Sequence, residues 1–180
     1  MTYLRKMLGT TRAGGLPRVS DREVFWSWCG AFFGIAAVGL LHQRFFDGTA
    51  QVLMVSSFGA SAVLLFGAPR SPLAQPRNLI GGHILSALIG VAAFKLLGGQ
   101  IWIAEAGAVA TAVALMHLTR TLHPPGGATA LLPVIGGDQI QNLGFLFALV
   151  PVALGALILL TVAVVFNNLP SSRRYPEAWL

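Results

Sequence analysis

Residues 121–137 read TLHPPGGATALLPVIGG, in which the run HPPGG, one histidine, two prolines and two glycines, is set between apolar stretches. Pro124 and Pro125 have no N–H to donate, and a proline restricts the residue before it to extended backbone. The spacing therefore predicts that the helix carrying His117 and Arg120 ends at His123. The chain is expected to break here and to start a new helix.

The two glycines of this stretch permit a sharp turn, so the new helix is expected to begin near Ala128 and Thr129. The first amides of such a helix have no intrahelical partner, and in hydrocarbon they are tolerated only where protein or water covers them. A helix N-terminus carries about half a positive charge, so we expect this one to attract an anion. The alternative is a cytoplasmic turn stabilised by the Pro-Pro-Gly-Gly sequence.

The composition is that of a membrane protein. Of 180 residues, 55% are hydrophobic and 10% are charged, which leaves too little polar surface for a soluble globule. Five apolar runs can cross about 30 Å of hydrocarbon: residues 24–41, 50–68, 79–97, 102–119 and 143–166. A sixth run, 126–137, reaches only about 18 Å as a helix. The expected fold class is an all-α, polytopic transmembrane helical bundle of about six spans, one of them short or broken after His-Pro-Pro-Gly-Gly.

The basic residues favour six crossings over five. With six, ten arginine or lysine residues lie on the side of the termini, and Arg44 and Lys95 lie opposite; with five, the ratio falls to eight against four. The positive-inside rule then places both termini in the cytoplasm, and we expect a bacterial inner membrane. Residues 1–23 are expected to form a cytoplasmic segment, 24–168 a single transmembrane domain and 169–180 a cytoplasmic tail.

Several classes of chemistry are not indicated. Cys29 is the single cysteine, which excludes an intrachain disulfide and a cysteine-cluster metal site. The basic residues lie at span ends, where orientation in the membrane explains them better than nucleic acid does. A P-loop, a dinucleotide fingerprint, HExxH and GxSxG are absent from the sequence. We expect no metal, no cofactor and no nucleic-acid partner.

Arginines flank the break and the loop at residues 67–84. The guanidinium groups of Arg70, Arg77 and Arg120 are candidates to bind a small planar oxyanion, ideally through two hydrogen bonds each. Such an arrangement suits nitrite. The alternative is that these arginines lie at lipid headgroups and only set the topology.

Four polar residues of the apolar stretches are further candidates. His123 can donate to an anion or be protonated with it, because a histidine titrates near neutral pH; alternatively it caps carbonyls freed by the prolines. His83 and His117 are candidates to line a pathway, since polar groups within spans face the bundle interior. Thr129 either adds a hydroxyl to the anion site or bonds back to its own helix. His42 is expected in a loop.

The string HPPGGATAL, preceded by SPLAQPRN-x-x-GGH, resembles the HPP family of integral membrane proteins, which is named for its His-Pro-Pro motif. The resemblance covers nearly the whole chain from the first span onward. Family members are multi-spanning proteins of bacteria and plastids, and plastid and cyanobacterial members have been linked to nitrite transport. The CBS domains that some relatives append are not in this chain, so their nucleotide regulation is not carried over.

The resemblance implies two sets of site positions. The first is the signature itself, from His123 to Gly127, and the second is the loop from Arg70 to Asn78. Together with the candidates above, the expected substrate-binding residues are His123, Pro124, Pro125, Gly126, Gly127, Thr129, Arg120, Arg70, Arg77, Asn78, His83 and His117.

The expected function is transport of a small inorganic anion by a secondary transporter or channel in the lipid bilayer. Nitrite is the first candidate substrate and nitrate the second. We expect a homo-oligomer, with a dimer favoured, and not an enzyme. Two alternatives stay open: an intramembrane enzyme that uses His123 and His117, and a non-transporting assembly or sensor subunit.

Overall fold

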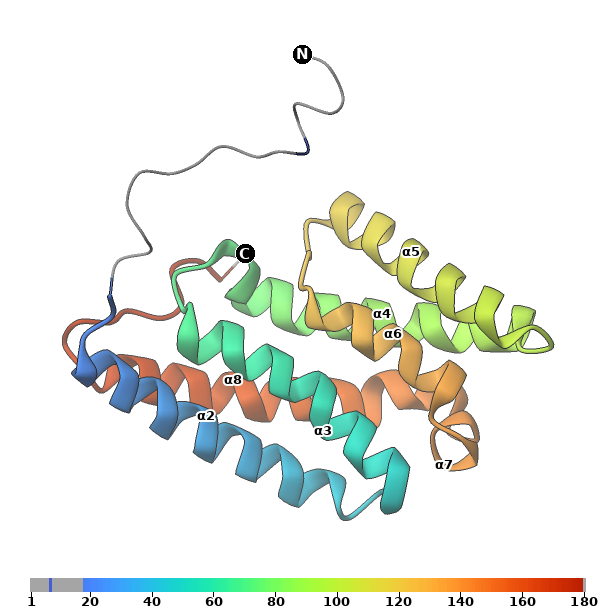
Figure 1. Ribbon diagram of the computed structural model, residues 1–180, viewed down its shortest axis with the longest axis horizontal. Helices are drawn as coiled ribbons and strands as arrows, with labels where there is room; N and C mark the ends of the chain where they lie inside the picture. Colours follow the sequence, from blue (N-terminus) through green and yellow to red (C-terminus); the bar gives the residue numbers. More distant parts are fainter. Residues whose placement is uncertain (1–6, 8–17, 180) are drawn as a thin grey trace.

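The computed structural model describes residue 7 and residues 18–179 of the chain. Every regular element in these residues is helical, which confirms the all-α fold class. Arg5, Lys6 and Arg12, which contribute to the expected charge bias, lie outside the described residues. The α-helices are α2 (Asp21–His42), α3 (Gly48–Ala62), α4 (Pro76–Leu97), α5 (Ile101–Thr119), α6 (Pro125–Ile135), α7 (Asp138–Gln141) and α8 (Leu154–Asn168) (Figure 1).

Five helical segments are long and apolar enough to cross a membrane. They are α2, α3 with a π-helical extension to Gly67, α4, α5, and Gly144–Asn168, which includes α8. Helix α6 is apolar but has 11 residues, and it runs back along α4 toward the end of the bundle where α5 begins (Figure 1). The polytopic bundle with one short helix is therefore confirmed.

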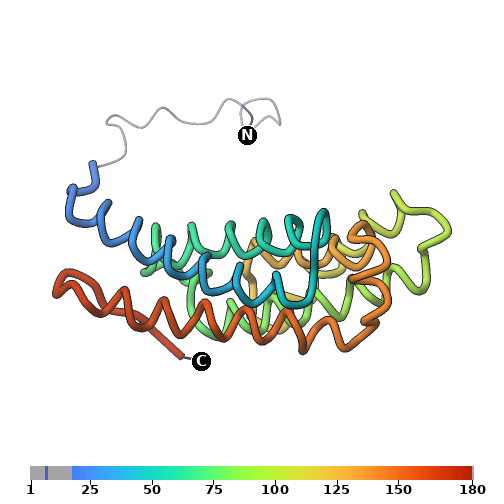
Figure 2. Tube along the Cα trace, turned by 90° about the horizontal axis from the view of Figure 1, so that it is seen from below, coloured from blue at the N-terminus to red at the C-terminus, as the bar shows by residue number. Residues whose placement is uncertain are grey.

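The helices form two groups of three. Helices α2, α3 and α8 pack together, and so do α4, α5 and α6; contacts of α3 with α6 and of α4 with α8 join the groups. All six run along the long axis of the molecule (Figures 1 and 2). Each group has its own apolar cluster, and the larger cluster extends into α4. A polar side chain between the groups is thus as far from lipid as this fold allows.

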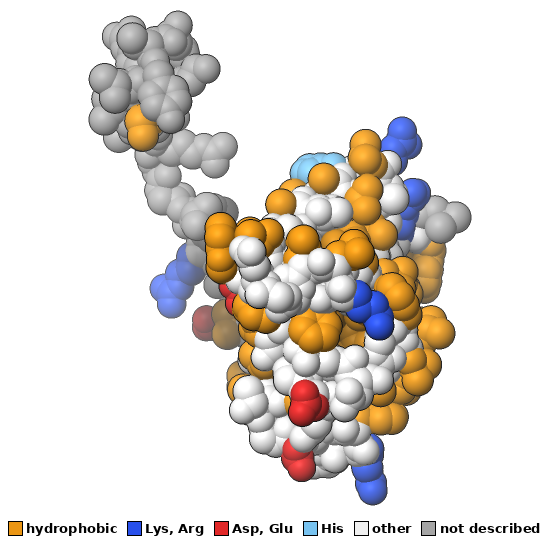
Figure 3. All heavy atoms as spheres, turned by 90° about the vertical axis from the view of Figure 1, so that its right-hand side faces the viewer, with side chains coloured by type: hydrophobic (Ala, Val, Ile, Leu, Met, Phe, Trp, Pro, Cys, Tyr) orange, Lys and Arg blue, Asp and Glu red, His pale blue; other side chains and the backbone are white. Residues whose placement is uncertain are grey.

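The start of α2 and the segment after α8 meet at one end of the bundle. Arg173 Nε lies 2.7 Å from Glu23 Oε2, and Arg70 donates a hydrogen bond to the carbonyl of Ser172. We call this the arginine end. Figure 3 looks onto the opposite end, where scattered charged side chains interrupt a surface of hydrophobic and neutral atoms; we call it the loop end, because it carries the α2–α3 loop.

Glycines bring the backbones of α4 and the α6 segment into close contact. A Cβ on Gly82 would lie 2.6 Å from His123 Cβ and 2.9 Å from the Thr121 carbonyl oxygen, and one on Gly126 would lie 2.7 Å from Ser86 Oγ. Small residues allow such an approach in lipid, where packing replaces the hydrophobic effect. The contact fixes the His-Pro-Pro segment against α4.

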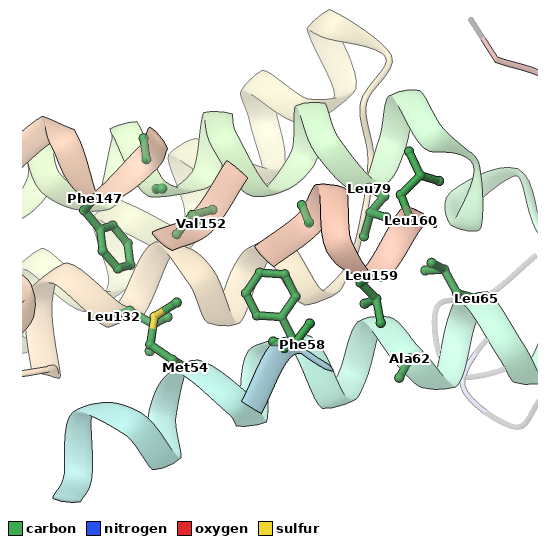
Figure 4. Close-up of a cluster of buried hydrophobic side chains, with 14 of the residues drawn as sticks. Met54, Phe58, Ala62, Leu65, Leu79, Leu132, Phe147, Val152, Leu159 and Leu160 are labelled. Atoms are coloured by element: carbon green, nitrogen blue, oxygen red, sulfur yellow. The ribbon is translucent and has the colours of Figure 1, made fainter. Parts of the chain in front are cut away.

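The largest apolar cluster surrounds Phe58 of α3. Figure 4 shows its ring between Val152 and Leu159 of the chain's last span and Met54 of its own helix. A Cβ on Gly155 would lie 2.8 Å from Phe58 Cζ, so this glycine leaves room for the ring against α8. Phe58 is 1% exposed.

Two expectations about helix ends are wrong. Helix α5 ends at Thr119, because Arg120 adopts left-handed backbone with φ 57°, before the prolines act. Helix α6 begins at Pro125 and not near Ala128. A proline is favoured in the first helical position because its fixed φ fits the helix and its missing N–H has no partner there anyway.

Candidate functional site

Five buried polar side chains meet between the two helix groups. Ser57 and Ser61 come from α3, His83 from α4 and Thr129 from α6, and His123 directly precedes α6. Each is 1% exposed or less. They are brought together because α3 contacts α6 while α4 and α6 lie backbone to backbone. We call this set the histidine chain.

Hydrogen bonds connect all five side chains. Ser61 Oγ lies 2.7 Å from His83 Nε2 and 2.9 Å from His123 Nε2. Thr129 Oγ1 lies 2.7 Å from His83 Nδ1 and 2.7 Å from Ser57 Oγ. At the arginine end, His123 Nδ1 lies 2.9 Å from the carbonyl oxygen of Leu73.

One carbonyl sets the direction of these bonds. The Leu73 oxygen can only accept, so His123 Nδ1 carries the hydrogen, and in a neutral imidazole Nε2 is then an acceptor. Ser61 therefore donates to His123 and accepts from His83 Nε2. This leaves His83 Nδ1 as the acceptor for the Thr129 hydroxyl. With both imidazoles neutral, the donors thus point from Thr129 through His83 and Ser61 to His123.

The hydrogen bonds of the histidine chain can all reverse their direction together. If His123 Nε2 takes up a proton, it becomes a donor and Ser61 must turn its hydroxyl toward His83 Nε2. In this state the hydrogen of His83 has moved from Nε2 to Nδ1, because Nε2 must now accept, and His83 donates from Nδ1 to Thr129. Histidine is the side chain suited to such a change, because either ring nitrogen can donate or accept. The arrangement can therefore pass a proton between its ends without an open water column.

The start of α6 does not offer bare amides. The Gly126 N–H donates to the His123 carbonyl at 2.8 Å, and the Gly127 N–H donates to the Pro124 carbonyl at 3.0 Å. Pro125 and Gly126 are buried, and the packing at Gly126 described above closes this end with side chains. The expectation of unpaired amides facing a wet chamber is wrong, because two turn hydrogen bonds satisfy them locally. The polar groups of this region are instead the side chains of the histidine chain.

The expected arginines lie outside the histidine chain. Arg70, Arg77 and Arg120 are exposed at the arginine end, and Arg77 donates to the Thr119 carbonyl at 2.9 Å. Asn78 donates to the Leu122 carbonyl at 2.8 Å. These bonds hold the first turn of α4 against the segment that contains the break, so their structural role is to fix the break in place.

Three other expected positions also face away from the chain or flank it. His117 is exposed on α5, and Pro124 is exposed beside the buried Pro125. Gly127 is half-buried. Of the expected residues, the structure joins His83, His123 and Thr129 in one hydrogen-bonded set.

The sequence reasoning missed Ser57 and Ser61. Both lie on one face of α3, because residues four apart share a helix face, and their spacing within an apolar run was the available signal. The Leu73 carbonyl had no signal, because a backbone acceptor is invisible in a side-chain pattern. His42 was expected in a loop but is the last residue of α2 and is 0% exposed.

Within the part of the chain that the structure describes, no group of three His, Cys, Asp or Glu residues is placed to hold a metal ion. The histidine chain has two imidazoles, and each of its ring nitrogens is already engaged by a protein oxygen. The chemistry available is therefore proton transfer and hydrogen bonding.

Comparisons with known proteins agree with this architecture. A family model described as the HPP transmembrane region matches residues 16–176. Two Dictyostelium discoideum proteins, each named a transmembrane protein, are 46% identical over 181 and 180 residues. The alignments cover 98% of this chain but 63% and 57% of those proteins, so the chain spans about three fifths of their length. No solved structure matches the chain significantly.

Proposed function

The chain belongs to the HPP transmembrane family, and from this we propose that it carries a small inorganic anion across the membrane, with nitrite as first candidate and nitrate as second. The observation that carries the proposal is the His83–Ser61–His123 arrangement, buried between the two helix groups. Ionisable side chains are costly within a membrane and mark substrate or proton pathways there. Transport accounts for the burial of these two imidazoles better than packing does.

The charge of the site favours an anion. Both ionisable members of the histidine chain are imidazoles, which are neutral or positive, and the hydrogen bonds of the chain involve no carboxylate. A cation substrate would leave a protonated histidine with an uncompensated repulsion. The exposed arginines at the arginine end raise the local concentration of anions beside that end of the bundle.

Proton coupling follows from the reversible chain. An anion that approaches His123 stabilises its imidazolium form and the reversed hydrogen bonds. When His123 then gives its Nε2 proton to Ser61, Ser61 gives its own to His83 Nε2 and His83 gives its Nδ1 proton to Thr129, which restores the neutral arrangement and delivers the proton toward Thr129. Anion and proton then cross together, so net charge movement is small. We expect uptake to rise as the pH on the donor side falls, because His123 must take up a proton for each anion that crosses.

Orientation, location and assembly belong to the same proposal. We place the arginine end on the cytoplasmic side of a bacterial inner membrane, because basic residues accumulate at cytoplasmic span ends. The working unit is a homo-oligomer, with a dimer favoured, since five spans and one short helix make a thin wall around a pathway.

The test is nitrite uptake into liposomes that contain the purified protein, with nitrate and chloride for comparison. His123→Ala removes the acceptor of Ser61 and should abolish uptake. His117→Ala is the matched control, because that histidine is exposed on α5 and should leave uptake unchanged. If the wild-type protein moves nitrite and nitrate in neither direction of the gradient, the transport proposal fails.

One observation favours a second candidate, an intramembrane enzyme. Ser61 Oγ donates to an imidazole that a carbonyl orients, which is the arrangement of a serine nucleophile and its base. A serine-directed fluorophosphonate should then label Ser61, and His123→Ala should prevent the labelling. We favour transport because Ser61 is 0% exposed and its oxygen is held between two imidazoles, so a substrate carbonyl has no approach to it.

A further inference from the structure

His42 lies apart from the histidine chain and has no hydrogen-bond partner. It ends α2 at the loop end, where its side chain is 0% exposed, and neither Nδ1 nor Nε2 is paired. A neutral imidazole has one donor and one acceptor, so both functions are unmet. The polar groups of Ser57, Ser61, His83 and His123 are all paired, which sets His42 apart from every other histidine buried here.

Buried polar atoms without partners call for a bound group that supplies them. An aromatic face can take a hydrogen only weakly and gives nothing to a lone pair, so the nearby Phe58 ring, centred 5.2 Å from the imidazole, leaves at least one nitrogen unmet. A small solute that both donates and accepts satisfies both nitrogens. Water has this property, and so does the protonated form of a small oxyacid.

His42 is in line with the histidine chain, and the Phe58 ring stands between them. Phe58 stacks on His83 with ring centroids 4.7 Å apart and an interplanar angle of 18°. The Phe58 ring also neighbours His42, and the ring centroids of His83 and His123 lie 5.0 Å apart. Four rings therefore run in series from the end of α2 toward the arginine end. Hydrogen bonds through Ser61 join His83 and His123, whereas the Phe58 ring separates His83 from His42.

The loop end has a hollow next to His42. Its volume is about 280 Å³, and the residues that line it are Gln43, Arg44, Phe45, Phe46, Asp47 and Gln139. Phe46, which is 5% exposed, lines this hollow, and its ring centroid lies 6.4 Å from that of His42. The hollow and His42 thus share Phe46 as a neighbour.

We propose that His42 is a second binding point for the transported species or its water, and that the Phe58 side chain is the gate between this point and the histidine chain. The inference rests on the proposed transport function and adds to it that the pathway lies within one protomer. Gly155 supports the gate, because a Cβ there would press on both Phe58 Cζ, at 2.8 Å, and His42 Nε2, at 3.2 Å. The glycine therefore leaves space beside both rings, and the Phe58 ring must move off His83, on which it stacks, to open the path.

Cysteine accessibility tests the path without knowledge of the substrate. In a Cys29→Ser background, His42→Cys is compared with Val38→Cys, which lies one turn earlier on the same face of α2 and is also 0% exposed. We expect a small methanethiosulfonate added at the loop end to modify His42→Cys about tenfold faster than Val38→Cys. Equal rates at the two positions would overturn the binding point.

The gate is tested with Ser61→Cys in the same background. The reagent added at the loop end should reach this cysteine only when Phe58→Ala is also present. Equal modification with Phe58 intact would overturn the gate, because the ring would then block nothing.

A transport measurement covers the case in which a cysteine variant does not fold. His42→Gln keeps a donor and an acceptor, whereas His42→Leu has neither, so nitrite uptake should be about tenfold lower in the leucine variant than in the glutamine variant. Equal uptake in the two would count against His42. Addition of nitrite distinguishes the solutes in the Ser61→Cys variant with Phe58→Ala, in which His42 is intact: an oxyacid bound at His42 slows modification of this cysteine as nitrite rises, and water does not.

The two proposals fail in different ways. If the wild-type protein takes up no nitrite but the labelling pattern is found, the substrate is wrong and the gated path stands. If nitrite uptake is present but His42→Cys reacts no faster than Val38→Cys, the transport function stands and this path falls.

Discussion

His83 of α4 and His123 of the break before α6 hold the same hydroxyl between their Nε2 atoms: that of Ser61, at 2.7 and 2.9 Å. The two rings lie 5.0 Å apart. Neither imidazole can change its protonation state without changing the hydrogen bond of the other, because Ser61 has a single hydrogen to give. This coupling makes the pair, and not either histidine alone, the unit of function.

Ser61→Ala should uncouple the pair. The change leaves one donor and one acceptor unpaired in the buried site, so we expect a loss of about 2 kcal/mol of stability and no proton-coupled nitrite uptake. Ser56→Ala is the control, because Ser56 is exposed on the same helix and bonds back to the Val52 carbonyl. Thermal unfolding in detergent and liposome uptake measure the two effects. Equal behaviour of both variants would contradict the coupling.

Thr129→Val should break the other end of the chain while keeping its shape. His83 Nδ1 loses its donor, and the expected cost is about 1–3 kcal/mol, with uptake strongly reduced. Thr129→Ser restores the hydroxyl and should restore uptake. Thr161→Val gives the background value, since Thr161 is exposed and bonds to the Leu157 carbonyl. Failure of the serine variant to rescue would show that volume matters at this position and the hydroxyl does not.

Gly82→Ala should force α4 away from the His-Pro-Pro segment. Its Cβ would lie 2.6 Å from His123 Cβ and 2.9 Å from the Thr121 oxygen, which cannot be relieved by a flexible side chain, so we expect a loss of roughly 1–3 kcal/mol. At Gly59 an added Cβ meets nothing within 4 Å, and alanine there should stabilise the helix by about 0.5–1 kcal/mol. Opposite signs of the two shifts in melting temperature are the expected result.

Arg173→Ala should loosen the arginine end. Its side chain is 4% exposed and binds the Glu23 carboxylate at 2.7 Å, and it also donates to Ser27 Oγ and to Asn167 Oδ1. Because Glu23 is 27% exposed, water can partly solvate the carboxylate that is left, and we expect a loss of about 1–3 kcal/mol from the unpaired groups. Arg174→Ala, at the exposed neighbouring position, should cost little. Comparable melting temperatures for both variants would argue against the ion pair as a structural clamp.

Cysteine labels should settle the orientation. In the Cys29→Ser background, a membrane-impermeant thiol reagent outside intact cells should modify Gln139→Cys and spare Ser172→Cys, whose position is at the arginine end. The pattern should invert in inside-out vesicles. Reaction of both positions from one face would mean that α6 and α7 do not complete a crossing.

The spans could be predicted from the sequence because hydrophobicity acts locally and adds up along the chain. Residues 24–41 were expected to cross where α2 runs from Asp21 to His42, and 102–119 where α5 runs from Ile101 to Thr119. The start of α6 was misplaced by about one turn because both prolines were treated as helix breakers, although Pro125 fits the first helical position.

The sequence by itself determined that this chain is a helical membrane protein with an interrupted helix after its His-Pro-Pro motif. It identified three members of the histidine chain as candidates, but it could not join them to Ser57, Ser61 or the Leu73 carbonyl. Tertiary structure alone decided those partners, and it alone placed Phe58 between His42 and His83. The reason is physical. The free energy of placing a span in lipid adds up residue by residue along the chain, so an apolar run can be read from the sequence. A hydrogen bond between helices depends on the rotation and depth of each helix, which many distant packing contacts set together.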